Sequence, residues 1–133
     1  MGKYNKTLTK EIKKIIKSGK LKCSVDEFEN RVEWYWTSRH QTLSEGFIRE
    51  FEDKVSWGMI SKYQKLSEEF IKEFENKVYW EWISKYQTLS EGFIRKFKDE
   101  VDWDWILRYQ TLSEKFHKEI REIIKLEKTE KEI

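Results

Sequence analysis

A block of 23 residues occurs four times in tandem along this chain, beginning at Val32, Val55, Val78 and Val101. Besides this valine, six positions of the block hold the same residue in every copy; in the first copy they are Trp34, Gln41, Leu43, Ser44, Glu45 and Phe47. Self-similarity at this spacing indicates a repeat array, in which each unit buries its apolar face against its neighbours. We therefore expect a stacked scaffold rather than a fold built around one unique site.

The array is predicted to be all-α. The chain contains no proline and only five glycines, and its apolar residues recur at helical rather than alternating spacing. In one continuous helix, at about 100° per residue, equivalent residues of successive copies would be rotated about the helix axis by roughly 140°. Such a helix could not present the same face to every neighbour. The helix must break in every copy. The expected fold is an α-solenoid-like array of four 23-residue helical hairpins with N- and C-terminal capping helices.

Capping signals predict where the helices begin. Residues 42–45, Thr-Leu-Ser-Glu, have the form of a capping box, as do the corresponding residues of two other copies, so the second helix of each hairpin is predicted to start there. The glutamate would then cap its own helix. Asp53 and its equivalents are good N-cap types for the first helix of the next copy. In the second copy we expect helices near Val55–Gln64 and Leu66–Glu75. The first of these is apolar on several sides, which is typical of a helix sandwiched between layers.

A chain of 133 residues corresponds to about one domain. We expect a single domain over residues 1–133. Residues 1–31 would form a basic N-terminal cap helix and a partial repeat, residues 32–123 the four tandem repeats, and residues 124–133 the polar C-terminal end of a closing helix.

The net charge of +2 is unevenly distributed. Residues 1–23 carry eight lysines and one acidic residue, Glu11, whereas the remainder has a net charge of −5. This asymmetry fits a tail that meets nucleic acid or an acidic partner. It fits equally well a basic amphipathic cap that docks on its own acidic body. The sequence leaves both interpretations open.

Several function classes lack a sequence signal. The apolar runs are far shorter than the roughly 20 residues needed to cross a bilayer, and no signal segment opens the chain. The single cysteine, Cys23, fits a reducing compartment, so we expect a cytoplasmic protein without membrane contact. His40, His117 and Cys23 have no ligand-like spacing, and no cofactor fingerprint or nucleophile motif occurs. We expect no metal, no cofactor and no enzymatic activity.

Two invariant positions have competing interpretations. The tryptophans recur at helical spacing, which favours core packing over a base-stacking platform. The glutamine at the end of the first helix could line a binding groove. Its amide is equally suited to tying together the turn between the helices or the next unit, and we favour this structural role.

One candidate surface is basic. The position of Arg39 is Lys or Arg in every copy, and stacking would turn it into a ladder of charge that could follow a phosphate backbone. A solvated face balanced by neighbouring acids is the alternative. The candidate nucleic-acid contacts are Arg39, Lys62, Lys85, Arg108, Lys13, Lys14 and Lys17.

A second candidate surface uses positions that differ between copies. Tyr35 and Tyr79 are aromatic where their counterparts are small or acidic, and tyrosine is a frequent interface hot spot. Glu81, Asp102 and Asp104 lie nearby in the sequence. These five residues are the candidate contacts with a protein partner; drift between copies without a partner is the alternative.

The segment Val-Asp-Trp-Asp-Trp-Ile at residues 101–106, followed by Tyr-Gln-x-Leu-Ser-Glu-x-Phe at residues 109–116, resembles short tandem repeats in proteins of large DNA viruses, phages and other mobile elements. The resemblance covers about residues 25–124. It implies a helical repeat fold and a cytosolic location in the host cell. Small proteins of this origin without catalytic residues often inhibit a host protein, for example a component of a CRISPR system.

The expected function is therefore a non-enzymatic scaffold that binds another protein, with inhibition of a host defence protein as its finer form. The alternative is nucleic-acid or nucleotide binding through the basic ladder and the lysine-rich N-terminus. The sequence does not reveal whether the chain binds a second copy of itself.

Overall fold

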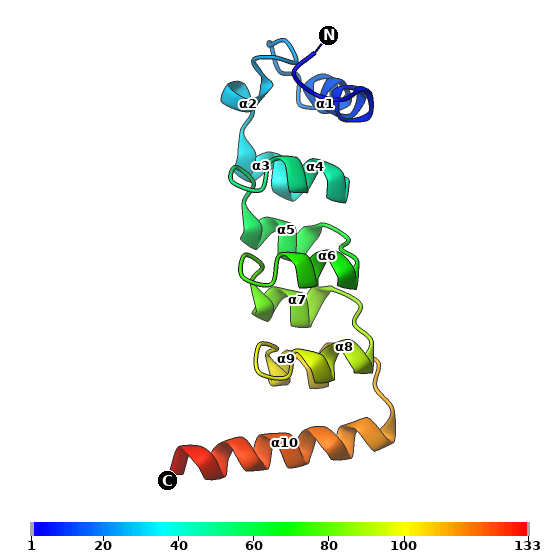
Figure 1. Ribbon diagram of the computed structural model, residues 1–133, viewed down its shortest axis with the longest axis vertical. Coiled ribbons are helices and arrows are strands. Elements are labelled where there is room, and N and C mark those ends of the chain that lie inside the picture. The colour runs from blue at the N-terminus through cyan, green and yellow to red at the C-terminus, as the bar shows by residue number, and fades with distance from the viewer. Residues whose placement is uncertain (1, 133) are drawn as a thin grey trace. The chain divides into compact units, whose positions relative to one another are not determined.

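The computed structural model describes residues 2–132, and the regular secondary structure of this part of the chain is all α-helix (Figure 1). The helices are α1 (Lys6–Ser18), α2 (Phe28–Arg31), α3 (Trp34–His40), α4 (Glu45–Glu50), α5 (Trp57–Tyr63), α6 (Glu68–Glu73), α7 (Trp80–Tyr86), α8 (Glu91–Lys96), α9 (Trp103–Tyr109) and α10 (Glu114–Glu132). The predicted all-α array of helical hairpins, with a helix before and after the repeats, is confirmed.

The chain divides into two compact units, Met1–Gln64 and Lys65–Ile133, called here the first and the second unit. The first unit contains α1 to α5, and α3 packs against α5. The second unit contains α6 to α10, and α7 packs against α9 in the same way. No helix in residues 2–132 combines the length and the apolar character that a membrane span requires.

Each repeat begins with a seven-residue helix, which is followed by a six-residue helix in the first three repeats and by the 19-residue α10 in the fourth; both helices of a repeat start later than predicted. The hydroxyl of Ser44 accepts a hydrogen bond from the backbone N–H of Phe47 at 3.0 Å, so serine, not Thr42, is the N-cap of α4. Ser56 rather than Asp53 precedes α5. The predicted starts were therefore wrong by two or three residues. Serine, threonine and aspartate are all good caps, so composition alone could not choose among them.

The core is built from apolar side chains of both helices of the repeats and of the terminal helices α1 and α10. The side chains with less than 2 % exposure are Phe28, Phe47, Phe70, Phe116, Ile12, Ile48, Ile60, Ile71, Ile83, Ile94, Ile106 and Ile120. Burying one such side chain contributes about 1.5–3 kcal/mol. Helices of six or seven residues are not stable alone in water, so this burial against neighbours holds them.

The invariant tryptophans pack on this core, as predicted, and fix the turn before their own helix. The indole N–H of Trp80 donates to the backbone carbonyl of Glu75 at 3.0 Å, and its ring stacks on Phe97 with centroids 5.1 Å apart. Trp34 and Trp57 make the same bond to a carbonyl five residues earlier. The indole nitrogen of Trp103 is instead buried without a hydrogen-bond partner.

The invariant glutamine ties neighbouring copies together. In the first unit the side-chain oxygen of Gln64 accepts from the N–H of Leu43 at 2.9 Å, and its NH2 donates to the carbonyls of Ser38 and Gln41 at 2.8 and 2.6 Å. Gln110 makes the same three bonds in the second unit. These carbonyls and N–H groups lie in the last turn of a helix and in the turn that follows it, where the helix itself cannot satisfy them. The predicted structural role is confirmed.

The invariant glutamate acts on the next copy rather than on its own helix. In the second unit, the Glu91 carboxylate accepts from the N–H and the hydroxyl of Ser113 at 2.6 and 3.0 Å. Glu68 accepts from Ser90 in the same manner. The predicted capping box within one helix was therefore wrong. Because the true partner is 22 residues away, a local motif could not reveal it.

The lysine-rich N-terminus forms a helical cap in the first unit. The apolar face of α1 is buried, including Leu8, Ile12 and Ile15, and α1 packs against α4. Glu11 bonds Ser44 as a repeat glutamate would, with 2.9 Å to its N–H and 2.6 Å to its hydroxyl. Apolar contacts and hydrogen bonds therefore hold α1 in the first unit. The exposed lysines of α1 point away from the core.

Candidate partner-binding surface

Exposed aromatic side chains concentrate on one helix of each repeat. Among residues 2–132, the large apolar side chains exposed by more than 40 % are Tyr35, Trp36, Tyr63, Tyr79, Tyr86, Tyr109 and Leu126. All except Leu126 lie on, or directly before, the seven-residue helices α3, α5, α7 and α9. We call the exposed side of α3 and α5 the first aromatic surface, and that of α7 and α9 the second aromatic surface.

On the first aromatic surface, basic side chains of the same copy and of the preceding copy approach the Tyr63 ring. The Arg39 guanidinium lies 5.0 Å and the Lys62 ammonium 5.3 Å from the centroid of the Tyr63 ring. Trp36 packs against His40, with centroids 5.1 Å apart. Contacts of a cation with an exposed ring stabilise by about 0.5–1 kcal/mol each. They hold these long side chains beside the aromatic rings.

The second aromatic surface repeats this arrangement more densely. The Lys85 ammonium lies 4.4 Å from the Trp105 ring, 5.2 Å from Tyr109 and 5.1 Å from Tyr86. The Arg108 guanidinium lies 5.7 Å from the Trp105 ring. Two cations and three aromatic rings therefore form one contiguous cluster on α7 and α9.

Acidic side chains occupy the opposite ends of the same helices. Glu81 and Asp104 are exposed in the first turns of α7 and α9. Asp102 is the N-cap of α9 and accepts from the N–H groups of Asp104 and Trp105 at 3.1 and 3.3 Å. Asp102 thus has a structural role that the sequence interpretation did not assign. Carboxylates at helix starts and cations at helix ends both suit the helix dipole. The second aromatic surface has both signs of charge.

The structure places the predicted protein contacts in both units. Tyr35 is 53 % exposed on α3 of the first unit, and Tyr79 is 50 % exposed directly before α7 of the second. Glu81, Asp102 and Asp104 belong to the unit of Tyr79. The predicted exposure of both tyrosines is confirmed.

The predicted nucleic-acid contacts also fall into separate groups. Lys13, Lys14 and Lys17 are exposed on α1 and line a cavity of about 690 Å³ with Lys10 and the turn at residues 42–44. Arg39 and Lys62 lie on the first aromatic surface, and Lys85 and Arg108 on the second. Each ladder cation contacts aromatic rings instead of standing alone in solvent.

Sequence reasoning missed much of the aromatic surfaces. The core packing expected of the invariant tryptophans does not extend to Trp36, which is 42 % exposed, and one side of the first helix of each copy carries exposed rings. The usable signal was a basic residue three positions after a tryptophan, at Trp36 and Arg39, and again at Trp105 and Arg108. That spacing places both side chains on one helical face.

Within residues 2–132, no three His, Cys, Asp or Glu side chains are grouped so that they could hold a metal ion. Comparison with family models, with curated proteins and with solved structures finds no match for this chain.

Proposed function

We propose that this chain is a non-enzymatic scaffold that binds another protein through its aromatic surfaces. The observation that carries the proposal is the gathering of half-exposed tyrosines and tryptophans on the first helix of each repeat, with basic side chains against them. Tyrosine, tryptophan and arginine supply most hot spots of protein interfaces. A solvated face without a partner would not need six large exposed rings on equivalent helices.

The charges of the second aromatic surface favour a protein over a nucleic acid as the partner. Glu81 and Asp104 lie on the same helices as Lys85 and Arg108, so a phosphate backbone following these helices would meet carboxylates. A base that stacked on Trp105 would have to displace the Lys85 ammonium, 4.4 Å from the ring centroid. A protein interface accommodates both charge signs around an aromatic centre.

Nucleic-acid or nucleotide binding is the second candidate function, and a different observation favours it. Four lysines of α1 line the cavity of about 690 Å³ in the first unit, with Glu11 as the acidic side chain among its lining residues. Binding there would weaken steeply as salt increases, because each phosphate contact releases counterions.

The finer form of the proposal is inhibition of a host defence protein in the cytosol of a host cell. The resemblance of the repeats to those of phages and mobile elements supports it. A stoichiometric complex that blocks its target needs only a surface, which agrees with a scaffold that offers aromatic anchors.

Affinity capture from lysate of the source cells, with and without nuclease, tests the proposal. The parent chain should recover one protein in near-equal molar amount under both conditions. Tyr35→Ala combined with Tyr79→Ala should lose it, whereas Leu126→Ala should retain it, because Leu126 is 63 % exposed but lies on α10. Circular dichroism confirms that all variants are folded.

Two results would contradict the proposal. If proteins are recovered only without nuclease, they are bound through nucleic acid, and nucleic-acid binding by the lysines of α1 becomes the favoured function. Full recovery by the double tyrosine variant would show that the aromatic surfaces do not bind the partner.

A further inference from the structure

An ion pair that links successive copies is replaced by two lysines at one step of the array. In the second unit the Arg95 guanidinium contacts the Glu119 carboxylate, 24 residues later, with 2.7 Å between Nε and Oε2. The position of Glu119 is also glutamate at Glu50 and Glu73, but the third copy has Lys96. The basic residue one copy before Lys96 is Lys72. The step from α6 to α8 therefore pairs a cation with a cation.

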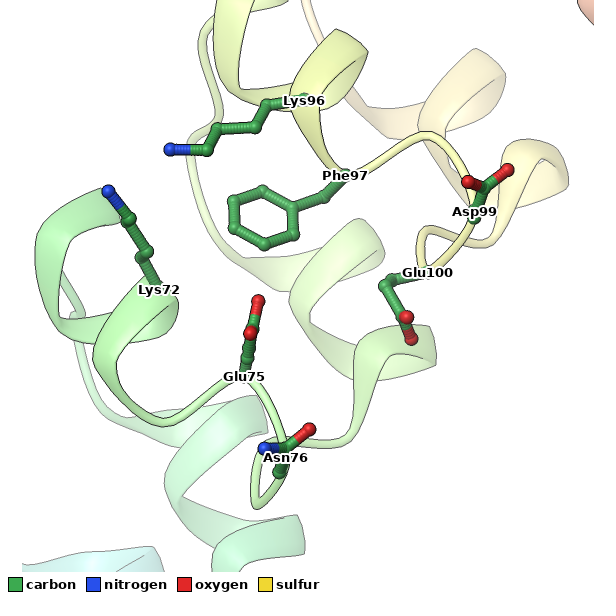
Figure 2. Close-up of a pocket in the computed structure, with 7 residues that line it drawn as sticks. All are labelled: Lys72, Glu75, Asn76, Lys96, Phe97, Asp99 and Glu100. Atoms are coloured by element: carbon green, nitrogen blue, oxygen red, sulfur yellow. The ribbon is translucent and has the colours of Figure 1, made fainter.

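The two lysines lie together at one end of a cavity of about 430 Å³ in the second unit. Figure 2 shows Lys72 and Lys96 reaching to the same side with their ammonium groups facing one another, and Asp99 and Glu100 on the other side of the Phe97 ring. The cavity thus has two ammonium groups at one end, the Phe97 ring with the Glu75 carboxylate beside it in the middle, and two carboxylates at the other end.

The two ammonium groups influence each other directly. Lys72, as a hydrogen-bonding neighbour and as a like charge, holds the pKa of Lys96 below its ordinary value, and Glu75 opposes this effect only in part. Neither lysine forms an ion pair within residues 2–132. Neighbouring like charges are unfavourable, and the repeat elsewhere avoids them with a glutamate at this position. A position that departs from its own repeat at a cost in stability is where function is expected.

We propose that the Lys72–Lys96 pair binds one oxyanion group, a carboxylate or a phosphate, of a ligand that is neutral or cationic where it passes Asp99 and Glu100. The oxyanion accepts hydrogen bonds from both ammonium groups and removes their repulsion. The carboxylates at the other end disfavour a continuous polyanion such as a nucleic-acid backbone. This site is separate from the aromatic surfaces, so it stands whether or not these bind a protein.

NMR titration of the full chain tests the site, with Lys96→Glu as the decisive variant. The probes are inorganic phosphate, the peptide acetyl-Glu-Gly-Lys-amide and a ten-nucleotide oligothymidine. Lys118→Glu is the matched control, because it makes the same charge change at the position equivalent to Lys72 on α10, outside the cavity. The observed signals are the side-chain carbon and nitrogen resonances of Lys72 in every protein, and those of Lys96 in the parent chain and in Lys118→Glu.

We expect saturable shifts with phosphate, with the peptide, or with both, and an apparent Kd at least tenfold higher in Lys96→Glu than in Lys118→Glu. Saturation by phosphate alone would identify a free or esterified phosphate as the ligand group, and saturation by the peptide alone a carboxylate side chain. Without ligand, Lys96→Glu should have a higher Tm than the parent chain, because it restores the pair seen at Arg95 and Glu119.

Three outcomes would overturn the proposal. The first is a shift that stays linear with probe concentration or is equal in both variants. The second is a lower Tm for Lys96→Glu, which would show that the two lysines are not in conflict. The third is tighter binding of oligothymidine than of either small probe, which would show that Asp99 and Glu100 do not select against polyanions.

Discussion

Removal of the Gln64 side chain is the sharpest test of how neighbouring copies are held together. Gln64 is only 5 % exposed, and it satisfies the N–H of Leu43 and the carbonyls of Ser38 and Gln41. Gln64→Ala leaves these three backbone groups without that partner. At about 1 kcal/mol for each hydrogen bond, and more where the orphaned group stays buried, the expected loss is about 3 kcal/mol. A domain of this size is stable by only about 5–15 kcal/mol.

Urea unfolding followed by circular dichroism measures this loss, and Gln41→Ala is the matched control. Gln41 is the same residue at the same position of the first copy, but its side chain makes no hydrogen bond within residues 2–132. Its replacement should change the free energy of unfolding by less than about 0.5 kcal/mol. Amide hydrogen exchange at Leu43 gives a local measure, because its N–H loses an acceptor only in Gln64→Ala.

Equal destabilisation by Gln64→Ala and Gln41→Ala would refute the reasoning. A second variant, Gln64→Glu, sharpens the test. A carboxylate keeps the acceptor for Leu43 but places an oxygen against the carbonyls of Ser38 and Gln41, so this variant should be at least as unstable as the alanine variant. Recovery of stability in Gln64→Glu would mean that only the bond to Leu43 matters.

Three further predictions follow from contacts within single units. The N–H of Ser113 holds the pKa of the Glu91 carboxyl below its ordinary value, so the stability that this bond provides is complete above the ordinary carboxyl pKa and is lost as the pH falls through the lowered one. Glu91→Gln should therefore differ most from the parent chain near neutral pH and progressively less below about pH 4, measured by urea unfolding at several pH values. Trp80→Phe should cost about 1 kcal/mol more than Trp103→Phe, because only Trp80 loses a hydrogen bond, whereas Trp103→Phe removes a buried, unpaired N–H. Ile12→Ala should cost about 3 kcal/mol by thermal unfolding, since Ile12 is fully buried on the inner face of α1.

Each of these has a clear opposing result. A difference between Glu91→Gln and the parent chain that is constant from pH 7 to pH 3 would show that the carboxylate charge is irrelevant. Equal costs at the two tryptophans would mean that the Trp80 bond to Glu75 contributes nothing. A negligible effect of Ile12→Ala would mean that α1 does not cap the first unit in solution.

Repetition made the fold predictable, because a helical pattern that must break in every 23-residue copy allows few solutions other than stacked hairpins. The helix starts were less predictable. Thr42 and Ser44 are both capping residues, and the choice depends on Glu11, which bonds the N–H and the hydroxyl of Ser44 from 33 positions away. Partners at such separations appear only when the copies are stacked.

The candidate surfaces were also predictable only in part. Exposure of Tyr35 and Tyr79 was predictable, because positions that differ between copies are seldom committed to the core. The cation–ring contacts were not predictable, because the Lys85 ammonium contacts the Trp105 ring of the next copy. The conflict between Lys72 and Lys96 was equally hidden, since the sequence does not state which residues of neighbouring copies face each other.

The bonds that join successive copies also bear on how fast the chain folds. Those made by the repeat serines, glutamines and glutamates connect residues 18 to 26 positions apart. Each closes a short loop, so little chain entropy is lost before a contact forms, and helical proteins dominated by such local contacts fold within microseconds to milliseconds. Any two adjacent copies could act as the nucleus from which order spreads along the chain.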